Sequence, residues 1–224
     1  QSQDLKNVFI TNPSIVILPD GRYLASCSGA FRVKGGEKGG ESFFISSDKG
    51  QTWVEQSRNS VEMTFCNLFL LNGQLYLMGT NRGYKDAVIS KSTDWGKTWS
   101  VPTDSLNGLI RKGGFYHSAP VPVVVHNGRI WRAFENAEDG KGKNKRALVI
   151  SAPINADLLK AESWTATNEL SFNVPEKLQS GHDFKQWLEG NVVVDKKGNV
   201  VNVLRVDELK EGGFAAITHI SGIE

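Results

Sequence analysis

Short β-prone runs separated by tight turns follow one another along the chain. Turns at Pro19-Asp20-Gly21, Asn72-Gly73, Asn127-Gly128 and Lys197-Gly198-Asn199 each stand between two such runs, which is the pattern of a β-hairpin. No segment shows a convincing helical period of apolar residues. The pattern therefore predicts an all-β protein built from antiparallel hairpins.

The hairpins group into four units of similar order. The expected strands are 14–18, 22–26 and 42–46 in the first unit; 67–71, 74–78 and 87–91 in the second; 121–125, 129–134 and 147–151 in the third; and 191–194, 200–206 and 214–220 in the fourth. The sequence stops after the third strand of the last unit. Because natural sheets avoid a long unpaired edge, we expect it to be the first part of a longer protein.

An octapeptide follows the third strand in the first two units. SSDKGQTW at residues 46–53 recurs as STDWGKTW at residues 92–99, and a period of roughly 40 to 50 residues indicates a blade or solenoid repeat. Each copy holds an aspartate that can accept backbone N–H groups, a glycine for an unusual backbone conformation, and a tryptophan expected to fill the gap between sheets. These residues are Asp48, Gly50 and Trp53 in the first copy and Asp94, Gly96 and Trp99 in the second.

The octapeptide resembles the Asp-box of the sialidase superfamily, whose members are β-propellers. The resemblance implies four-stranded antiparallel blades, six when complete, of which this chain would cover about four. The blades would span about 8–60, 61–108, 109–178 and 179–224, the last one incomplete. In that superfamily the box stabilises the outer edge of a blade, so we expect a structural role for its aspartates.

Composition narrows the class of partner. The 224 residues carry a net charge of only +2, which argues against a nucleic-acid binder, and the basic run from Lys141 to Arg146 is interpreted as a solvated hairpin tip. No apolar run is long enough to span a membrane. We expect a secreted or periplasmic protein, and the polar start of the sequence then means that its leader has already been removed. Cys27 and Cys66 leave the redox compartment open, and no residue cluster with ligand spacing indicates a metal or other cofactor.

In a propeller, the segments that enter the first strands and leave the second strands meet at a central funnel. The polar residues at these places include arginines and carboxylates, which suits an acidic or polyhydroxylated ligand such as a glycan or polysaccharide. They are Asn12, Asn67, Tyr116, His117 and Glu189 before or within first strands, and Arg32, Arg82, Glu135, Arg205 and Asp207 after second strands.

Glu189 and Arg205 carry the sharpest part of the resemblance. Sialidases have a glutamate before an inner strand and an arginine at the end of the next, so Glu189 would take a proton from a nucleophilic tyrosine and Arg205 would grip the substrate carboxylate. The alternative is a cross-strand ion pair between these two residues. The first unit departs from the pattern. Thr11-Asn12-Pro13-Ser14 stands where sialidases have Arg-Ile-Pro, and the aspartate that sialidases use as the general acid is absent.

The third unit suggests a different centre. Tyr116 and His117 come before an inner strand, and histidine is suited to proton transfer near neutral pH. Some propeller enzymes that act on acidic polysaccharides use histidine, tyrosine and arginine rather than the sialidase set.

Three functions follow from these observations. The leading hypothesis is a sialidase-like glycoside hydrolase that removes a terminal acidic or deoxy sugar, with Glu189 and Glu135 as acid/base candidates, Tyr116 and His117 at the same funnel, and the arginines binding the acidic group. The alternatives are a glycan- or protein-binding propeller without catalysis and a polysaccharide lyase.

Overall fold

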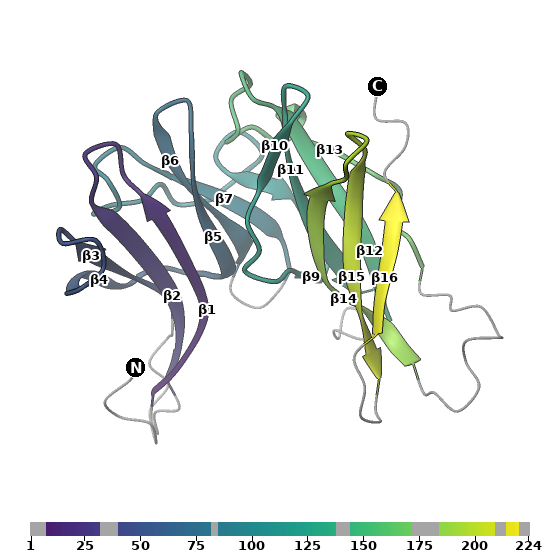
Figure 1. Cartoon of the computed structure of the whole chain (residues 1–224), viewed down its shortest axis with the longest axis horizontal. Helices are drawn as coiled ribbons and strands as arrows, with labels where there is room; N and C mark the ends of the chain where they lie inside the picture. Colours follow the sequence, from purple (N-terminus) through teal and green to yellow (C-terminus); the bar gives the residue numbers. More distant parts are fainter. Residues whose placement is uncertain are drawn as a thin grey trace.

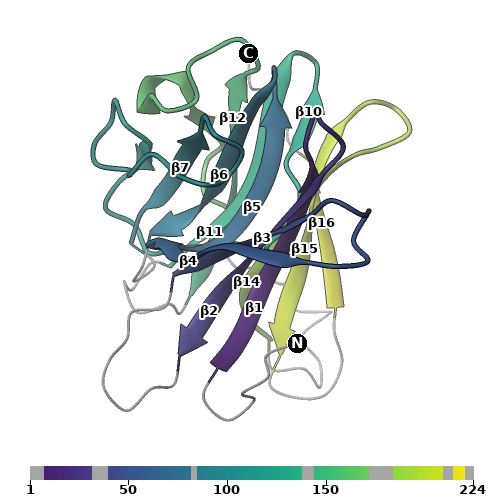
Figure 2. The same cartoon turned by 90° about the vertical axis from the view of Figure 1, so that its left-hand side faces the viewer.

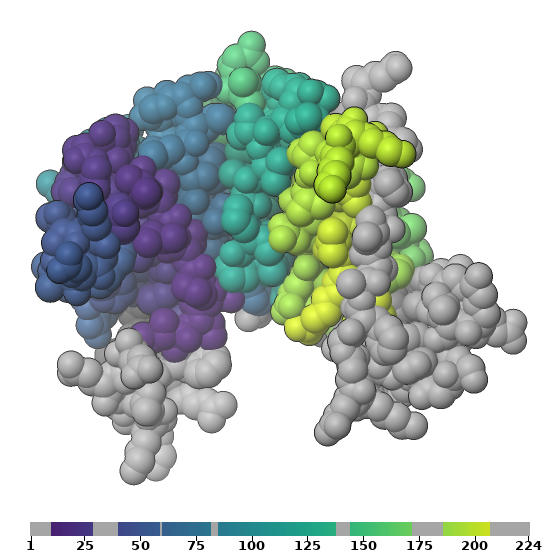
Figure 3. Space-filling view, viewed as in Figure 1, coloured from purple at the N-terminus to yellow at the C-terminus, as the bar shows by residue number. Residues whose placement is uncertain are grey.

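Four antiparallel sheets follow one another along the chain and lie side by side in sequence order (Figures 1 and 3). The computed structural model describes residues 8–31, 40–81, 85–137, 144–171, 184–208 and 214–219. Within these ranges the only helix is a single 3-10 turn, η1 (Ala161–Ser163). The all-β prediction is confirmed.

Each sheet is called a blade below. Blade 1 contains β1 (Val8–Ile17), β2 (Tyr23–Phe31), β3 (Glu41–Ser46) and β4 (Val54–Val61). Blade 2 contains β5 (Met63–Leu71), β6 (Gln74–Asn81), β7 (Ala87–Ser92) and β8 (Leu109–Arg111). Blade 3 contains β10 (Val124–His126), β11 (Arg129–Ala137), β12 (Lys145–Pro153) and β13 (Thr165–Ala166), with β9 (Tyr116–His117) also paired to β11. Blade 4 contains β14 (Phe184–Val194), β15 (Val200–Glu208) and β16 (Phe214–His219).

Successive blades bury their apolar faces against each other. Leu24 and Phe43 of blade 1 belong to one core cluster with Leu75 and Leu77 of blade 2, and further clusters join blade 2 to blade 3 and blade 3 to blade 4. Each fully buried Leu or Phe contributes roughly 1.5 to 3 kcal/mol. Figure 2 shows blade 1 from its free side, with β3 and β4 crossing β1 and β2 steeply because of the sheet twist.

Asn-Gly pairs close two hairpins at the predicted positions. Asn72 and Gly73 have φ angles of 50° and 72°, and Asn127 and Gly128 have 48° and 70°. Two consecutive positive φ angles define the tight turn that matches strand twist, and asparagine and glycine are the residues that tolerate them. Each turn therefore sets the register of its hairpin locally.

In blades 1, 2 and 4 the innermost strand is longer than the sequence predicts and contains an irregularity. In β1, β5 and β14 two residues of the inner strand oppose one residue of the second strand, and the first of the two has a positive φ. These residues are Asn12 (53°), Phe65 (54°) and Glu189 (52°). In blade 3 the segment between β9 and β10 interrupts the inner strand at the corresponding place. Such bulges break the apolar alternation, which hides the first part of each strand from a pattern search.

The two octapeptide turns share their hydrogen bonds and connect the third strand to the outer part of the blade. Asp48 accepts the backbone N–H of Thr52 at 2.8 Å, and Asp94 accepts that of Thr98 at 2.8 Å. Hydrogen bonds from the Thr52 hydroxyl, the Thr52 N–H and Ser46 lower the pKa of Asp48 to about 2. These carboxylates are used by their own turns.

The tryptophans of the two turns differ. Trp99 stacks on Phe43 of blade 1, with ring centroids 4.9 Å apart, and so fills the gap between blades 1 and 2. Trp53 is 39% exposed and donates its indole N–H to Gly50 of its own turn. The expected gap-filling role therefore does not hold for Trp53, because its side of blade 1 faces no other sheet among the described residues.

The structure also places the two cysteines and part of the basic run. Cys27 and Cys66 are both free thiols. Of the basic run, Lys141 and Lys143 lie outside the described residues, Lys145 is buried, and Arg146 pairs with Glu169 at 2.8 Å. The end of the run is thus part of blade 3 rather than a solvated tip.

Candidate active site

Contacts at the inner-strand bulges of blades 1, 2 and 4 and at β9 and β11 of blade 3 connect all four blades. The Asn12 amide lies 3.5 Å from the Thr64 hydroxyl, which joins blade 1 to blade 2. The rings of Phe65 and His117 meet edge to face at 4.4 Å, which joins blade 2 to blade 3. Glu135 accepts the Gly190 N–H at 2.7 Å, which joins blade 3 to blade 4. We call the residues that make these contacts, together with Glu189 beside Gly190 and its partner Arg205, the mouth.

Glu189 and Arg205 form an ion pair at the mouth. The Arg205 guanidinium donates to the Glu189 carboxylate at 2.8 Å, and their side chains are 39% and 46% exposed for Glu189 and Arg205. The cross-strand ion pair, predicted as the alternative to catalytic and substrate-binding roles for these two residues, is therefore present. An exposed ion pair is worth only about 0 to 1 kcal/mol, so a ligand that offers comparable hydrogen bonds can separate it.

His117 and Glu135 form a second pair behind the first. The Glu135 Oε2 lies 2.7 Å from His117 Nδ1, and the Glu135 side chain has no exposed surface, whereas that of His117 is 15% exposed. Both carboxylate oxygens of Glu135 are used, one by His117 and one by Gly190. Glu135 was expected as an acid/base group in contact with substrate, but its burial prevents that contact.

Tyr116 does not reach the mouth. Its side chain is 3% exposed, lies in the core cluster between blades 2 and 3, and its hydroxyl accepts a hydrogen bond from Arg111 Nε at 2.9 Å. Successive residues of a strand point to opposite faces, so Tyr116 faces the core where its neighbour His117 faces the mouth. The structure thus separates two residues that the sequence grouped together.

Asn67 is a connection between blades rather than a ligand contact. It is 6% exposed, donates to the Ser14 hydroxyl of blade 1 at 3.0 Å, and accepts the Val123 N–H of blade 3 at 3.2 Å. Asn12 stays at the mouth and is partly exposed, with its amide also 3.5 Å from the Ser28 hydroxyl.

Three expected binding residues are not placed by the structure. Arg32 and Arg82 lie outside the described residues, and Asp207 belongs to β15, where only its backbone pairing with Gln186 is described. Their contribution to the site stays a prediction.

Two buried charged residues near the mouth are not among the predicted site residues. Arg132 has no exposed surface, and its Nη2 donates to the Phe65 carbonyl at 2.8 Å and to Ala119 at 3.2 Å. Burial lowers the pKa of Arg132 to about 10. It holds the blade 2 bulge against blade 3. The preceding residue, Trp131, points to the opposite face of the strand and is also buried. The burial of Arg132 could have been predicted only from knowing that both faces of this strand are covered.

Glu41 is the second of these residues. It has no exposed surface, accepts the Ser28 hydroxyl at 2.7 Å, and burial raises its pKa to about 7. Ala87 and Ala147 take the corresponding places in blades 2 and 3. Burying a charged carboxylate where the other blades have an apolar side chain costs free energy, which favours the protonated form of Glu41.

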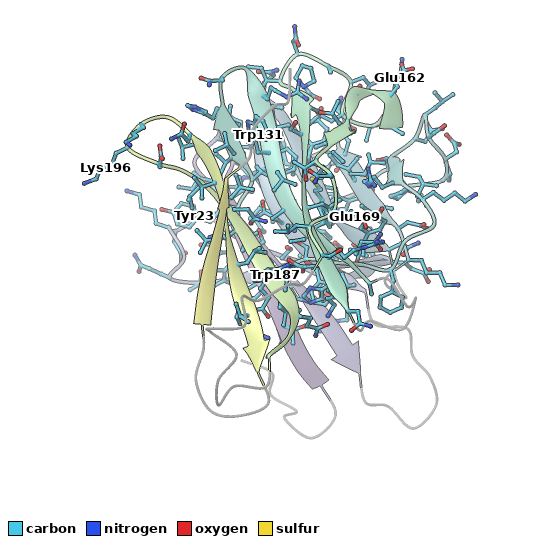
Figure 4. All side chains as sticks on the ribbon, turned by 90° about the vertical axis from the view of Figure 1, so that its right-hand side faces the viewer. Tyr23, Trp131, Glu162, Glu169, Trp187 and Lys196 are labelled. Carbon is cyan, nitrogen blue, oxygen red and sulfur yellow. The ribbon has the colours of Figure 1, made fainter. Side chains whose placement is uncertain are left out.

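Other features of the described chain lie away from the mouth. A pocket of about 340 Å³ between blades 1 and 2 is lined by Val61, Met63 and Trp99 among others, and by none of the mouth residues. On the blade 4 side, Trp131 and Trp187 lie within the sheets, while Lys196 is at the tip of the β14–β15 hairpin (Figure 4).

Within the described ranges no three His, Cys, Asp or Glu side chains gather as metal ligands would, and no helix there could span a membrane.

The arrangement of the blades is shared with solved glycoside hydrolases. An α-L-arabinanase from Penicillium chrysogenum, complexed with arabinobiose, superposes with a TM-score of 0.59 at 16% identity over 94% of this chain. An α-L-arabinofuranosidase from Lactobacillus brevis gives 0.59 at 14% identity over 98%. A family 117 glycoside hydrolase from Zobellia galactanivorans gives 0.58 at 14% identity over 97%. The fold is a β-propeller.

The propeller covers only part of these proteins: 62% of the arabinanase, 75% of the arabinofuranosidase and 68% of the family 117 enzyme. No protein-family model and no curated protein sequence matches the chain. At these identities the likeness establishes the fold.

Proposed function

We propose that this propeller is a glycoside hydrolase whose active site lies at the mouth, with Glu189 and His117 as the groups that meet the substrate. The observation that carries the proposal is the position of Glu189: a partly exposed carboxylate, held at a left-handed bulge and paired to Arg205, directly before the glycine that binds Glu135. The likeness to arabinan- and arabinoside-cleaving propellers supports the reaction class.

Hydrolysis of a glycosidic bond requires a group that stabilises positive charge at the sugar and a group that donates a proton to the glycosidic oxygen. Glu189 can supply the first as an anionic carboxylate at the mouth. His117 can supply the second, since imidazole exchanges protons near neutral pH. Its Nδ1 is taken by Glu135, which leaves Nε2 as the nitrogen for substrate.

The same site also bears on the kind of sugar. Arg205 is paired with Glu189, and His117 with Glu135, so both of these basic side chains already have an acidic partner within the protein. Phe65 adds an apolar surface beside His117. These features support a neutral terminal sugar, such as an arabinofuranosyl residue. The acidic sugar of the sialidase-like hypothesis would need Arg32 and Arg82, and it is the second candidate.

A panel of aryl glycosides tests the proposal on the full-length protein. It should include a neutral α-L-arabinofuranoside, a sialoside and a uronide, with ultraviolet absorbance to detect unsaturated lyase products. We expect hydrolysis of the neutral glycoside, and a loss of about 10²- to 10⁴-fold in Glu189→Gln and in His117→Gln. Glu162→Gln, in the exposed η1 turn, is the matched control and should keep full activity.

Two results would redirect the proposal. Unchanged turnover in Glu189→Gln would remove the catalytic role of the mouth. Saturable binding of arabinobiose, measured by calorimetry, with no cleavage of any substrate would identify a binding propeller instead.

A further inference from the structure

Glu135 uses its two carboxylate oxygens to connect the two groups that the proposed function places at the substrate. Oε2 lies 2.7 Å from His117 Nδ1 on β9, and Oε1 accepts the Gly190 N–H on β14 at 2.7 Å. We propose that Glu135 is the positioning residue of this site, which fixes the tautomer of His117 and the backbone that presents Glu189. This inference rests on the proposed function for its catalytic consequence, but its structural content can be measured without a substrate.

The first half concerns the imidazole. An ionised carboxylate can only accept hydrogen bonds, so His117 must carry a proton on Nδ1. The imidazolium can then donate its Nε2 proton to the leaving glycosidic oxygen, and the neutral ring that remains has its lone pair on Nε2, where it takes a proton back from water. The Phe65 ring packs edge to face on the imidazole at 4.4 Å and restricts its rotation. A buried partner that selects one tautomer makes one nitrogen available for proton transfer.

The second half concerns the bulge. Glu189 has a φ of 52°, a conformation that residues with a Cβ adopt at a cost. A Cβ at Gly190 would lie 2.8 Å from Asn202 Oδ1 and 2.9 Å from the Ala133 Cβ, so the strand passes close to both neighbours here. The Gly190 N–H bond to Glu135 holds the peptide that follows Glu189 in this place. The same carboxyl group therefore sets the relative positions of His117 and Glu189.

Glu135→Gln separates this role from simple packing. The glutamine has nearly the same shape, and its amide oxygen can still accept the Gly190 N–H. Its NH₂ group then faces His117 Nδ1, which must become an acceptor, so the proton moves to Nε2. The wild-type residue and the variant thus predict opposite neutral tautomers for one histidine in an otherwise similar fold.

The test is a long-range ¹H–¹⁵N spectrum of histidine-labelled protein. The chain has four histidines, and His117→Gln assigns the relevant signals. We expect the wild type to show the Nδ1–H form of His117 and Glu135→Gln to show the Nε2–H form, while Gly190 keeps slow amide exchange in both. Activity should fall in Glu135→Gln by about 10²-fold or more in kcat with little change in KM, while Glu162→Gln is unaffected.

The outcomes separate the two proposals. An Nε2–H tautomer in the wild type, or an unchanged tautomer in Glu135→Gln, overturns the positioning role whatever the activity. Fast exchange of the Gly190 amide in the wild type overturns the second half, and this measurement needs no variant to fold. A tautomer change together with full activity in Glu189→Gln would leave the geometry intact and overturn the proposed function instead.

Discussion

Asn12 and Glu189 occupy the same position in two different blades. Each is the first residue of the inner-strand bulge, with a φ of 53° and 52°, opposite a single residue of the second strand. Phe65 takes this position in blade 2. In blades 1, 2 and 4 the propeller therefore repeats a left-handed backbone position at its mouth and fills it with three different side chains.

Replacing Glu189 by glycine should stabilise the fold while removing activity. Glycine adopts a positive φ without the penalty of roughly 1 to 2 kcal/mol for a residue with a Cβ, and the lost ion pair with Arg205 is worth at most about 1 kcal/mol. We expect the free energy of unfolding to rise by up to about 1 kcal/mol in a denaturant titration. Asn12→Gly is the control and should change it less, because asparagine tolerates this conformation. A clear loss of stability in Glu189→Gly would show that the side chain serves the fold.

Removing Asp94 should weaken blade 2 through its outer turn. The carboxylate accepts the Thr98 N–H at 2.8 Å and the Thr98 hydroxyl at 2.6 Å, so Asp94→Ala should lower the free energy of unfolding by about 1 to 2 kcal/mol. Thermal unfolding followed by circular dichroism measures this. Lys97→Ala changes an exposed residue of the same turn and should have little effect. Equal losses in both variants would argue against the hydrogen bonds as the cause.

Glu41 should make stability fall as pH rises. Burial raises the pKa of Glu41 from 4.5 to about 7, so the folded state holds a proton that the unfolded state has released. The contribution is fully present below pH 4.5 and is lost as pH rises towards 7, by an amount of up to about 3 kcal/mol. Glu41→Gln should remove this slope from denaturation curves between pH 4.5 and 7.

Glu55→Gln provides the comparison for Glu41. The hydrogen bond from Arg58 lowers the pKa of Glu55, so its titration lies below the window and its removal should leave the slope in place. If Glu41→Gln keeps the wild-type slope, another group is responsible for it.

Asn67→Ala should loosen the contact of three blades. The variant leaves the partly buried Val123 N–H without its acceptor and removes the bond to Ser14, which costs about 1 to 3 kcal/mol in the free energy of unfolding. Gln74→Ala, at the exposed start of β6, serves as the control. A change below about 0.5 kcal/mol in Asn67→Ala would mean that these two hydrogen bonds contribute little to the contact of the blades.

The sequence by itself determined the central hairpins of the blades, their turns and their repetition. Asn72-Gly73 and Asn127-Gly128 specify tight turns through their own backbone preferences, and the two octapeptides close through hydrogen bonds between residues two to four apart. Such information is local, so a single sequence reveals it. The bulges were missed because Glu189-Gly190 and Phe65-Cys66 lack a local signature and interrupt the alternation used to find strands.

Only the tertiary structure decided which side chains meet. Glu135 binds Gly190 from 55 residues away, and Asn12 approaches Thr64 from 52 residues away. Whether a polar residue is buried, as Glu135 and Asn67 are, or open to a ligand, as Glu189 is, depends on the blade that packs beside it. Because that neighbour is supplied by a distant part of the chain, the choice of Glu189 and His117 at the mouth, with Tyr116 in the core, followed from the packing of the blades.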